Sequence, residues 1–427
     1  MTSHSLFLSH RLPYPPNKGD KIRSHALLRH LAARGPVHLA CFIDDKDDLQ
    51  HLDTVRALAG GECYFEPFGA AAKMRRSLMG LITGQPLTTA CFGSARLKQW
   101  VDRTLDSLPI RDLLVFGSAM APYLLETPAA SRVLFDMVDI DSDKWRQYAQ
   151  VSRGGLKWLY GREAEKLERL ECAAASAFGH TILASEFEAE TFRHIAPQSA
   201  AKISGLANGV DLEGFTPSAR QSPFSRSELP IVMTGRMDYR PNHEGAVWFA
   251  REVFPRVLQA APQAKVYFVG SGPPAALRAV ADSRTVVTGA VADVRPYLQY
   301  ARAVIAPLHI ARGIQNKVLE AMAMAKPLVA TREATRALDT QAGVHLWVEN
   351  EPARFADAVV EALTGPQRET VAQNARHYVE QHHDWSRLLK DADVQLAALN
   401  PPSPSLACAR PRPAAGPALE LSPRFKS

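Results

Sequence analysis

Two stretches decide the fold of this chain: Thr234-Gly-Arg-Met-Asp-Tyr-Arg-Pro-Asn242 and, further along, Arg312-Gly-Ile-Gln-Asn-Lys-Val-Leu-Glu-Ala-Met-Ala323. Each combines a strand end, a tight loop and the start of a helix. Each also brings positive charge or backbone N–H donors to the point where an anionic ligand would lie. Together they predict parallel α/β architecture and a site for a nucleotide diphosphate attached to another group, for which a sugar is the best candidate.

Composition and length fit a soluble protein of two domains. The chain has 427 residues, of which 46% are hydrophobic and 22% charged. Half of the formal charge of +6 lies in residues 401–427, where four basic residues face Glu420 alone, so we do not expect nucleic-acid binding. The five cysteines form no Cys-x-x-Cys pair, which argues against a zinc site or a disulfide framework.

The sequence predicts a cytoplasmic location. The first residues lack the basic and apolar segments of a signal peptide, and no apolar run reaches the roughly 18–20 residues of a membrane span. One segment, 73–83, mixes three cations with large apolar side chains. It is typical of a helix lying on an anionic membrane surface, but it fits equally well a buried helix with a solvated basic end. Peripheral contact with the cytoplasmic membrane face therefore stays open.

Short apolar runs alternate with helical stretches along the whole chain, which indicates βα units on parallel sheets. The expected strands are 5–8, 37–42, 113–116, 133–137 and 181–184 in the first half, and 231–234, 265–269, 285–288, 303–306, 328–331 and 344–348 in the second. The expected helices are 20–33, 156–175, 242–260, 274–281, 293–300, 316–325, 351–364 and 386–398.

This alternation predicts an α/β protein with two Rossmann-like doubly wound domains facing each other across a cleft. We expect an N-terminal domain at 1–216, a hinge at 217–230 that is rich in Ser, Pro and Arg, and a C-terminal ligand-binding domain at 231–380. A helix within 381–399 is long enough to cross back. The Pro- and Ala-rich tail 400–427 is expected to be disordered.

The first of the two stretches offers cations at the end of a strand. Gly235 and Arg236 follow the strand at 231–234, so the Arg236 guanidinium would project into the cleft. Asn242 is the expected N-cap of the next helix. A diphosphate would accept charge-assisted hydrogen bonds from Arg236, with Arg240 as a second cation. The alternative is that Arg236 only pairs with a neighbouring carboxylate.

The second stretch offers a cation and a carboxylate at the start of a helix. Gly313 permits a tight turn, and Asn316 or Lys317 opens the helix. Lys317 would bind phosphate, and Glu320, three residues later on nearly the same face, would accept hydrogen bonds from the ribose hydroxyls. An ordinary exposed Lys–Glu pair is the alternative.

Two features of the first half complete the predicted site. Gly19, between the first strand and its helix, would allow close backbone approach to a ligand from the opposite wall, unless it serves only as a turn. Asp136 and Asp139 lie at a strand end beside the cleft, where one of them could orient an acceptor hydroxyl or act as a base. Capping and solvation of the loop by the later aspartates is the alternative. Lys144 and Gln150 stand where a calcium loop needs Gly and Glu, so we predict no metal site.

Taken together, these motifs resemble the retaining family 4 glycosyltransferases of GT-B fold. The resemblance covers most of residues 1–395 in order, and it looks closest to the sugar transferases of bacterial exopolysaccharide loci associated with PEP-CTERM sorting systems. The motifs that carry it are Asn208-Gly-Val-Asp211, Gly235-Arg236, Gly270-Ser-Gly-Pro273, and Gly313…Lys317…Glu320 with the apolar run that follows.

The resemblance implies transfer of a hexose, with retention, from a nucleotide diphosphate sugar to a saccharide that is expected to be lipid-linked. It implies that Glu320 holds the ribose, that Arg236 and Lys317 bind and stabilise the diphosphate, and that Gly19 approaches the donor. No metal or other cofactor is expected, since cations and helix ends stabilise the leaving group. The loop backbone that would face the transferred sugar belongs to Gly313, Ile314, Gln315 and Asn316.

The chain also departs from the family pattern. Arg312 replaces the usual second glutamate, Arg240 is the nearest substitute for a missing lysine, and the histidine that many relatives carry after the fourth strand is absent after Phe116. Two other functions therefore stay open. One is a nucleotide-sugar 2-epimerase, and the other is a non-catalytic subunit that binds sugar nucleotides.

Overall fold

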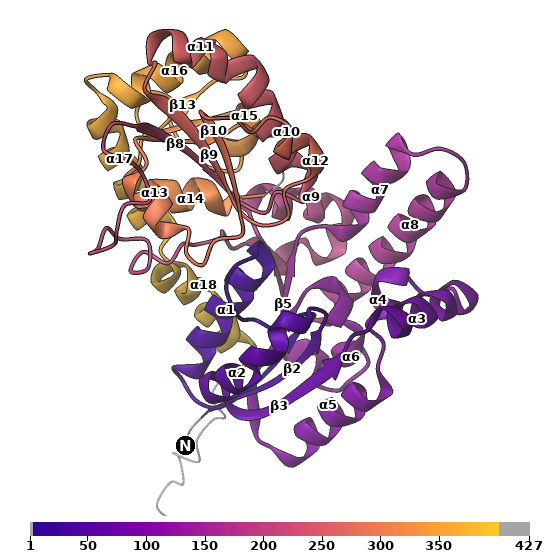
Figure 1. Ribbon diagram of the computed structural model, residues 1–427. Helices are drawn as coiled ribbons and strands as arrows, with labels where there is room; N and C mark the ends of the chain where they lie inside the picture. The colour runs from indigo at the N-terminus through magenta and orange to yellow at the C-terminus, as the bar shows by residue number, and fades with distance from the viewer. Residues whose placement is uncertain (1–2, 312, 401–427) are drawn as a thin grey trace, which may run out of the picture.

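The computed structural model describes residues 3–311 and 313–400, which form two α/β domains (Figure 1). The N-terminal sheet has seven strands in the order β3-β2-β1-β4-β5-β6-β7, and the C-terminal sheet has six in the order β10-β9-β8-β11-β12-β13. Neighbouring strands are parallel in both sheets. The predicted fold class is therefore confirmed. Arg312 and the tail predicted to be disordered, from 401 onward, lie outside the described residues.

The N-terminal domain covers its sheet with helices on both faces. Phe7 of β1 belongs to a core beneath α1, α2 and α18, whereas its neighbours Leu6 and Leu8 belong to a second core beneath α5, α6, α8 and α9. Because successive strand side chains point to opposite faces, a strand buried on both sides reads as a continuous apolar run. The elements are β1 (His4–Ser9), α1 (Gly19–Ala32), β2 (Val37–Ile43), η1 (Lys46–His51), α2 (Leu52–Ala59), β3 (Gly60–Pro67), α3 (Ala70–Thr83), α4 (Leu87–Cys91), α5 (Ala95–Ser107), β4 (Ile110–Phe116), η2 (Ser118–Met120), α6 (Pro122–Leu125), η3 (Ala130–Arg132), β5 (Val133–Val138), α7 (Asp141–Val151), α8 (Gly154–Ala177), β6 (His180–Leu183), α9 (Glu186–Ile195), η4 (Pro197–Lys202) and β7 (Ile203–Gly205).

The C-terminal domain repeats the same plan around one large apolar cluster. Its last helix, α18, leaves this domain and packs beside α1 and β5 of the other. The elements are β8 (Leu229–Thr234), α10 (Arg240–Trp248), the π-helical η5 (Phe249–Val253), α11 (Phe254–Ala260), β9 (Ala264–Val269), α12 (Ala275–Arg278), β10 (Thr285–Gly289), α13 (Arg295–Tyr300), β11 (Ala303–Ala306), α14 (Asn316–Ala323), β12 (Leu328–Ala330), α15 (Arg332–Thr335), β13 (Trp347–Val348), α16 (Pro352–Thr364), α17 (Arg368–His382) and α18 (Trp385–Leu399).

The strand order of each sheet reverses once near its middle. In the N-terminal sheet the reversal lies between β1 and β4, and in the C-terminal sheet between β8 and β11. In doubly wound proteins, ligands bind outside the carboxyl ends of the strands at this point. Gly19 follows β1, Gly235 follows β8, and α14 follows β11, so the predicted ligand residues belong to the two reversal points.

Several elements differ from the sequence-based expectation. The edge strands β3 and β7 and the helix α17 were not expected, and Val344 lies in a loop because β13 is only Trp347–Val348. Leu229 and Pro230, expected in the hinge, already belong to β8. The predicted N-cap role of Asn242 is wrong, since α10 begins at Arg240 and Asn242 lies in its first turn.

Candidate active site at the junction of the two domains

Because Gly235 has no side chain, Lys317 of the second quoted stretch can approach the backbone of the first. Its φ is +141°, and a methyl group added there would lie 2.9 Å from Asn242 Nδ2 and 3.0 Å from Lys317 Nζ. Asn242 Nδ2 donates to the Arg236 carbonyl at 2.6 Å, and Asn242 Oδ1 accepts a hydrogen bond from Lys317 Nζ. A neutral amide therefore holds the Lys317 ammonium at the end of β8.

Lys317 and Glu320 occupy the polar side of α14, whose other side is core. Val318, Leu319 and Met322 are buried, which fixes the rotation of the helix and leaves Lys317 and Glu320 half-buried at the junction. Burial lowers the pKa of Lys317 to about 8, although the charge of Glu320 acts to raise it. Burial likewise raises the pKa of Glu320 to about 7, against the effect of Lys317.

Lys317 and Glu320 have few hydrogen-bond partners among the residues that the structure describes. The Glu320 carboxylate makes no hydrogen bond to any residue that the structure describes. Asn316 Oδ1 at the start of α14 and Thr234 Oγ1 at the end of β8 are buried without a partner among residues 3–311 and 313–400. Because buried polar atoms are normally hydrogen-bonded, this cluster has the composition of a site for a polar ligand.

The N-terminal domain approaches this cluster closely. A methyl group added at Gly19 would lie 3.5 Å from Asn316 Nδ2, and one added at Gly313 would lie 3.8 Å from Asp139 Oδ1. Gly19 and Asn316 are the first residues of α1 and α14. The positively polarised ends of two helices thus meet where the predicted donor residues gather.

The loop that leads into α14 also lies here. Gly313 has φ of +56°, in the left-handed region that glycine adopts without strain. Ile314 is buried in the C-terminal core, and Gln315 Nε2 donates to the Gly313 carbonyl at 3.5 Å. The structure therefore brings Gly19, Gly235, Gly313, Ile314, Gln315, Asn316, Lys317 and Glu320 together.

The two arginines of the first stretch are paired with neighbouring carboxylates. Arg236 Nε donates to Asp238 Oδ1 at 3.0 Å and its Nη2 donates to Oδ2, while both side chains stay exposed. Asp45 and Asp20 of the other domain are close enough to act on the charge of Arg236, so this pair faces the junction. Arg240 donates to Glu244 at 2.7 Å on the solvent-exposed side of α10.

Asp136 and Asp139 take different positions. Asp136 is fully buried, and its Oδ2 accepts from Arg23 Nε at 2.7 Å. Arg23 also donates to the Leu206 carbonyl at 2.7 Å and to Asn208 Oδ1 at 3.0 Å. Arg23 thus connects α1 to Asp136 of β5 and to the start of the linker, residues 206–228, that follows β7. Of the two carboxylates, Asp139 lies beside Gly313 and is the one at the junction.

Sequence reasoning missed the partners of the predicted residues. Asn242 holds Lys317 and Asp238 holds Arg236, and both lie within the first quoted stretch, where an amide and a carboxylate near a predicted cation were available signals. Arg23 carried no such signal, because it lies 113 positions from Asp136 in the sequence.

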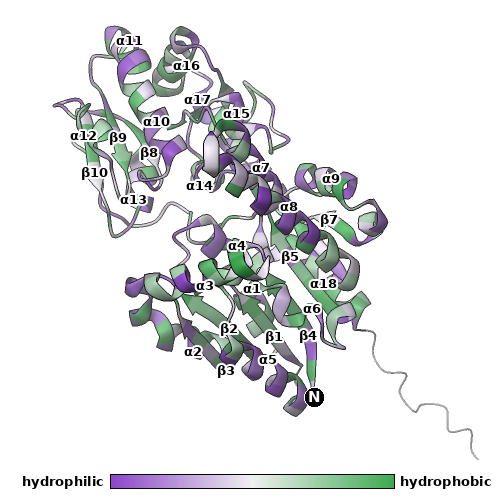
Figure 2. Ribbon diagram, turned by 90° about the vertical axis from the view of Figure 1, so that its right-hand side faces the viewer, coloured by the Kyte–Doolittle hydropathy of each residue, from purple (hydrophilic) through white to green (hydrophobic). Residues whose placement is uncertain are grey.

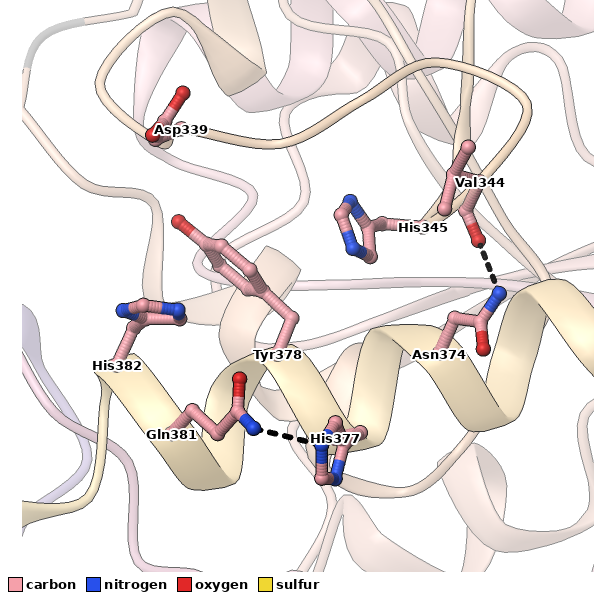
Figure 3. A pocket seen from close by; sticks show the side chains of 8 residues that line it. All are labelled: Asp339, Val344, His345, Asn374, His377, Tyr378, Gln381 and His382. Atoms are coloured by element: carbon pink, nitrogen blue, oxygen red, sulfur yellow. Dashed lines mark hydrogen bonds between the residues drawn. The ribbon is translucent and has the colours of Figure 1, made fainter.

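A pocket of about 390 Å³ lies elsewhere, between α17 and the loop before β13 (Figure 3). None of the predicted ligand residues lines it. No group of His, Cys, Asp or Glu within the described ranges could hold a metal ion. In the same part of the chain, no helix is long and apolar enough to cross a membrane. The pocket is lined by Asp339, Val344, His345, Asn374, His377, Tyr378, Gln381 and His382.

Two facing doubly wound domains with paired reversal points define the GT-B fold. Residues 228–365, which include β8 and α14, match the family model described as "Glycosyl transferases group 1". A comparison with curated proteins gave no match.

Solved structures with this fold match nearly the whole chain. HepE from Anabaena, in complex with UDP and glucose, is 16% identical with a TM-score of 0.65, and the match covers 93% of this chain and 100% of that one. Sucrose-phosphate synthase from Thermosynechococcus elongatus is 18% identical with a TM-score of 0.65, covering 93% and 99%. WaaG, a glycosyltransferase involved in lipopolysaccharide biosynthesis, is 17% identical with a TM-score of 0.62, covering 91% and 99%. At these identities the similarity establishes the fold.

Proposed function

We propose that this protein is a family 4-like glycosyltransferase that moves a hexose from a nucleotide diphosphate sugar to a saccharide acceptor. The observation that carries the proposal is the cluster of Lys317, Asn242 and Glu320 at the N-terminus of α14, directly opposite Gly19. Two further findings support it. The matching family model spans this cluster, and HepE, which has the same fold, binds UDP and glucose.

The donor would bind mainly to the C-terminal domain. Lys317 would place its ammonium on the diphosphate, with the N-terminus of α14 and Arg236 adding positive charge. The pair with Asp238 leaves Arg236 Nη1 without a partner in the described part of the chain. The Glu320 carboxylate would accept hydrogen bonds from the ribose hydroxyls. These roles explain why a half-buried cation and a half-buried carboxylate have so few hydrogen-bond partners among the described residues.

The transfer itself would occur between the two domains. Departure of the nucleotide diphosphate leaves positive charge on the anomeric carbon, and Lys317 and Arg236 would stabilise the negative charge of the leaving group. The acceptor hydroxyl would attack from the same face, which gives retention. Asp139, which lies beside Gly313, would orient this hydroxyl. Approach of Gly19 from the opposite wall would exclude water from the reacting atoms.

The acceptor is proposed to be a lipid-linked saccharide in exopolysaccharide biosynthesis, with peripheral contact between the protein and the membrane surface. The resemblance of the motifs to the transferases of such loci supports this assignment. The similarity in fold to WaaG, which is involved in lipopolysaccharide biosynthesis, also supports it.

Donor binding by variants tests the proposal. Glu320→Ala and Arg236→Ala should each remove donor binding while the fold stays intact, because both groups lie at the surface of the junction and not in a core. A thermal-shift screen across UDP-, GDP- and ADP-sugars would first identify the donor, since a specific ligand stabilises the native state. Calorimetry with that donor would then compare the variants. Wild-type affinity in both would show that the site is wrongly assigned.

A further inference from the structure

Helix α3 turns an apolar face to solvent. Met74, Leu78 and Ile82 are spaced four residues apart, so they share one side of the helix. Their exposed fractions are 74%, 58% and 72%, which are large for side chains of this kind. Single exposed apolar residues are common, but a row of them along one helix marks a contact surface.

A second apolar surface lies where α7 turns into α8. Val151 is 83% exposed, Trp158 66% and Leu156 55%. Behind them the rings of Trp145, Tyr148 and Tyr160 pack together, with centroids 5.3 to 6.1 Å apart. This aromatic cluster stiffens the helical hairpin and holds its apolar tip away from the domain core.

The two surfaces are joined on one side of the N-terminal domain. Arg162 of α8 donates to the Gln85 carbonyl at 3.1 Å and to the Gly80 carbonyl at 3.4 Å, just around the end of α3. The Glu163 carboxylate accepts hydrogen bonds from the first backbone N–H groups of α4 at 2.7 Å. Figures 1 and 2 show α3, α4, α7 and α8 on this same side. The helices therefore present their exposed residues as one unit.

Charge is distributed unevenly on this side. The segments 67–101 and 144–162 contain no Asp or Glu and carry five Lys or Arg residues each, although the whole chain has 44 acidic residues. Four of these cations, Arg76, Lys98, Arg146 and Arg162, pair with acids outside the two segments. The cations Lys73, Arg75, Arg153 and Lys157 are exposed, and none forms an ion pair within residues 3–311 and 313–400.

We propose that the exposed residues of α3 and of the α7–α8 tip form one membrane-docking face that binds an anionic lipid bilayer. Exposed cations beside apolar side chains complement acidic headgroups above an acyl layer. Trp158 and Tyr148 are the ring types that favour the membrane interface. A bilayer fits these surfaces better than a partner protein does, because the apolar side chains lie beside exposed cations in segments that contain no acidic residue.

The docking face also gives the acceptor a route to the site. Helix α7 starts at Asp141, two residues after Asp139 at the junction, and its 11 residues span roughly 16 Å to the tip. A bilayer at the tip would place a lipid-borne saccharide within reach of the junction. This inference rests on the proposed function for the identity of the lipid cargo, but the docking itself can be tested without it.

Vesicle flotation tests the inference with the full chain. The wild type should float with phosphatidylcholine vesicles that contain phosphatidylglycerol and stay unbound with phosphatidylcholine alone. The triple variant Met74→Ser, Leu78→Ser, Ile82→Ser and the double variant Val151→Ser, Trp158→Ser should each bind roughly tenfold less, because each loses buried apolar area at the interface. The control Phe187→Ser, Val394→Ser removes equally exposed apolar residues from α9 and α18, and it should bind like the wild type.

The outcomes separate this inference from the proposed function. Absence of binding to acidic vesicles, or equal binding by all variants, would overturn the docking face. Neither result would bear on the affinity for the donor, so the proposed function would stand. A stable dimer that both variants dissociate would also overturn it, by assigning the surface to a second copy of the chain. Selective loss of flotation in the two variants would support it, even if no nucleotide sugar binds to the protein.

Discussion

The two walls of the junction hold their buried charges in different ways. On the N-terminal wall two buried cations have carboxylate partners: Arg23 donates to Asp136, and Lys21 donates to Asp48 at 2.6 Å. On the C-terminal wall Lys317 is held by a neutral amide, and Glu320 accepts no hydrogen bond from the described residues. The buried charges of the first wall are paired with each other, although Arg23 Nη2, Asp48 Oδ2 and Asp136 Oδ1 have no hydrogen-bond partner among the described residues. The second wall holds its half-buried cation without a carboxylate hydrogen bond in the same part of the chain.

From this difference we expect the N-terminal wall to contribute mainly to stability and the C-terminal wall mainly to ligand affinity. Buried ion pairs on the N-terminal wall fix α1 and the linker, because breaking such a pair leaves an uncompensated charge. On the C-terminal wall, burial lowers the pKa of Lys317 and raises the pKa of Glu320, and each shift favours the neutral form of the group. An anionic ligand would favour the charged form of Lys317, so its binding would raise the pKa of Lys317 and offset the cost of burying this cation.

The largest expected effect breaks the N-terminal wall. Arg23→Met would leave Asp136 buried without its partner, and we expect the free energy of unfolding to fall by about 3–5 kcal/mol. Urea unfolding would measure the loss. The control Arg56→Met removes an exposed pair with Asp53 and should change stability by less than about 1 kcal/mol. Equal effects of the two variants would contradict a stabilising role for the buried pair.

The next effect breaks the C-terminal wall. Lys317→Met should weaken donor binding roughly 100-fold, since it removes a charged hydrogen bond to the diphosphate. It should not lower the melting temperature at pH 7, because the folded state no longer has to bury a cation. Calorimetry and thermal unfolding would measure the two quantities.

The pH dependence of stability gives an independent check of Lys317. Its folded pKa of about 8 lies below the unfolded value, so the unfolded state binds more protons between about pH 8 and 10.5. The wild type should therefore gain stability relative to Lys317→Met as the pH rises through this range. A constant difference between the two proteins would contradict the lowered pKa.

A smaller effect should appear as a pH dependence of donor affinity. Because the pKa of Glu320 is about 7, its carboxylate becomes protonated below neutral pH and loses acceptor capacity for the ribose. Wild-type affinity should fall about five- to tenfold from pH 7.5 to 6. Glu320→Gln should bind weakly with no such slope, as titration calorimetry at the two pH values would show. The same slope in this variant would assign the titration to another group.

The smallest effect distinguishes the two arginines. Arg240 pairs with Glu244 on the exposed side of α10, so Arg240→Ala should change donor affinity less than about twofold. Arg236→Ala, which alters the pair that faces the junction, should change it far more. Equal losses of affinity in both variants would show that the donor site includes Arg240 and extends further along α10 than the structure indicates.

The sequence predicts the fold because local patterns determine it. Apolar runs such as 303–306 coincide with β11, and the break at Asn316 coincides with the start of α14. The edge strand β3 was missed because its side chains are mostly half-exposed and Gly60 and Gly61 open it, so it carries no apolar run. Helix α17 was missed because its exposed face makes the segment polar.

Prediction of the site from the sequence was limited because several of its contacts join residues that are distant in the chain. Gly19 was expected to face a ligand, but its contact with Asn316 depends on how the domains sit together. The burial of Asp136 could not be read from its neighbours, because Arg23 arrives from another helix. Lys317 and Glu320 were recognisable as a pair, whereas their shifted pKa values depend on the packing around α14.

The doubled connection between the domains restricts how they can move. The chain passes out through the linker after β7 and returns before α18, and the two passages are joined where Val210 N–H donates to the His383 carbonyl at 2.8 Å. His383 Nδ1 bonds the Asn208 carbonyl at the same place, also at 2.8 Å. Two chain segments that are hydrogen-bonded side by side can act as a hinge axis between the domains. We therefore expect any opening of the domains to be a rotation about this line. A single cut in the linker should leave the two domains associated, because α18 still packs on the N-terminal domain.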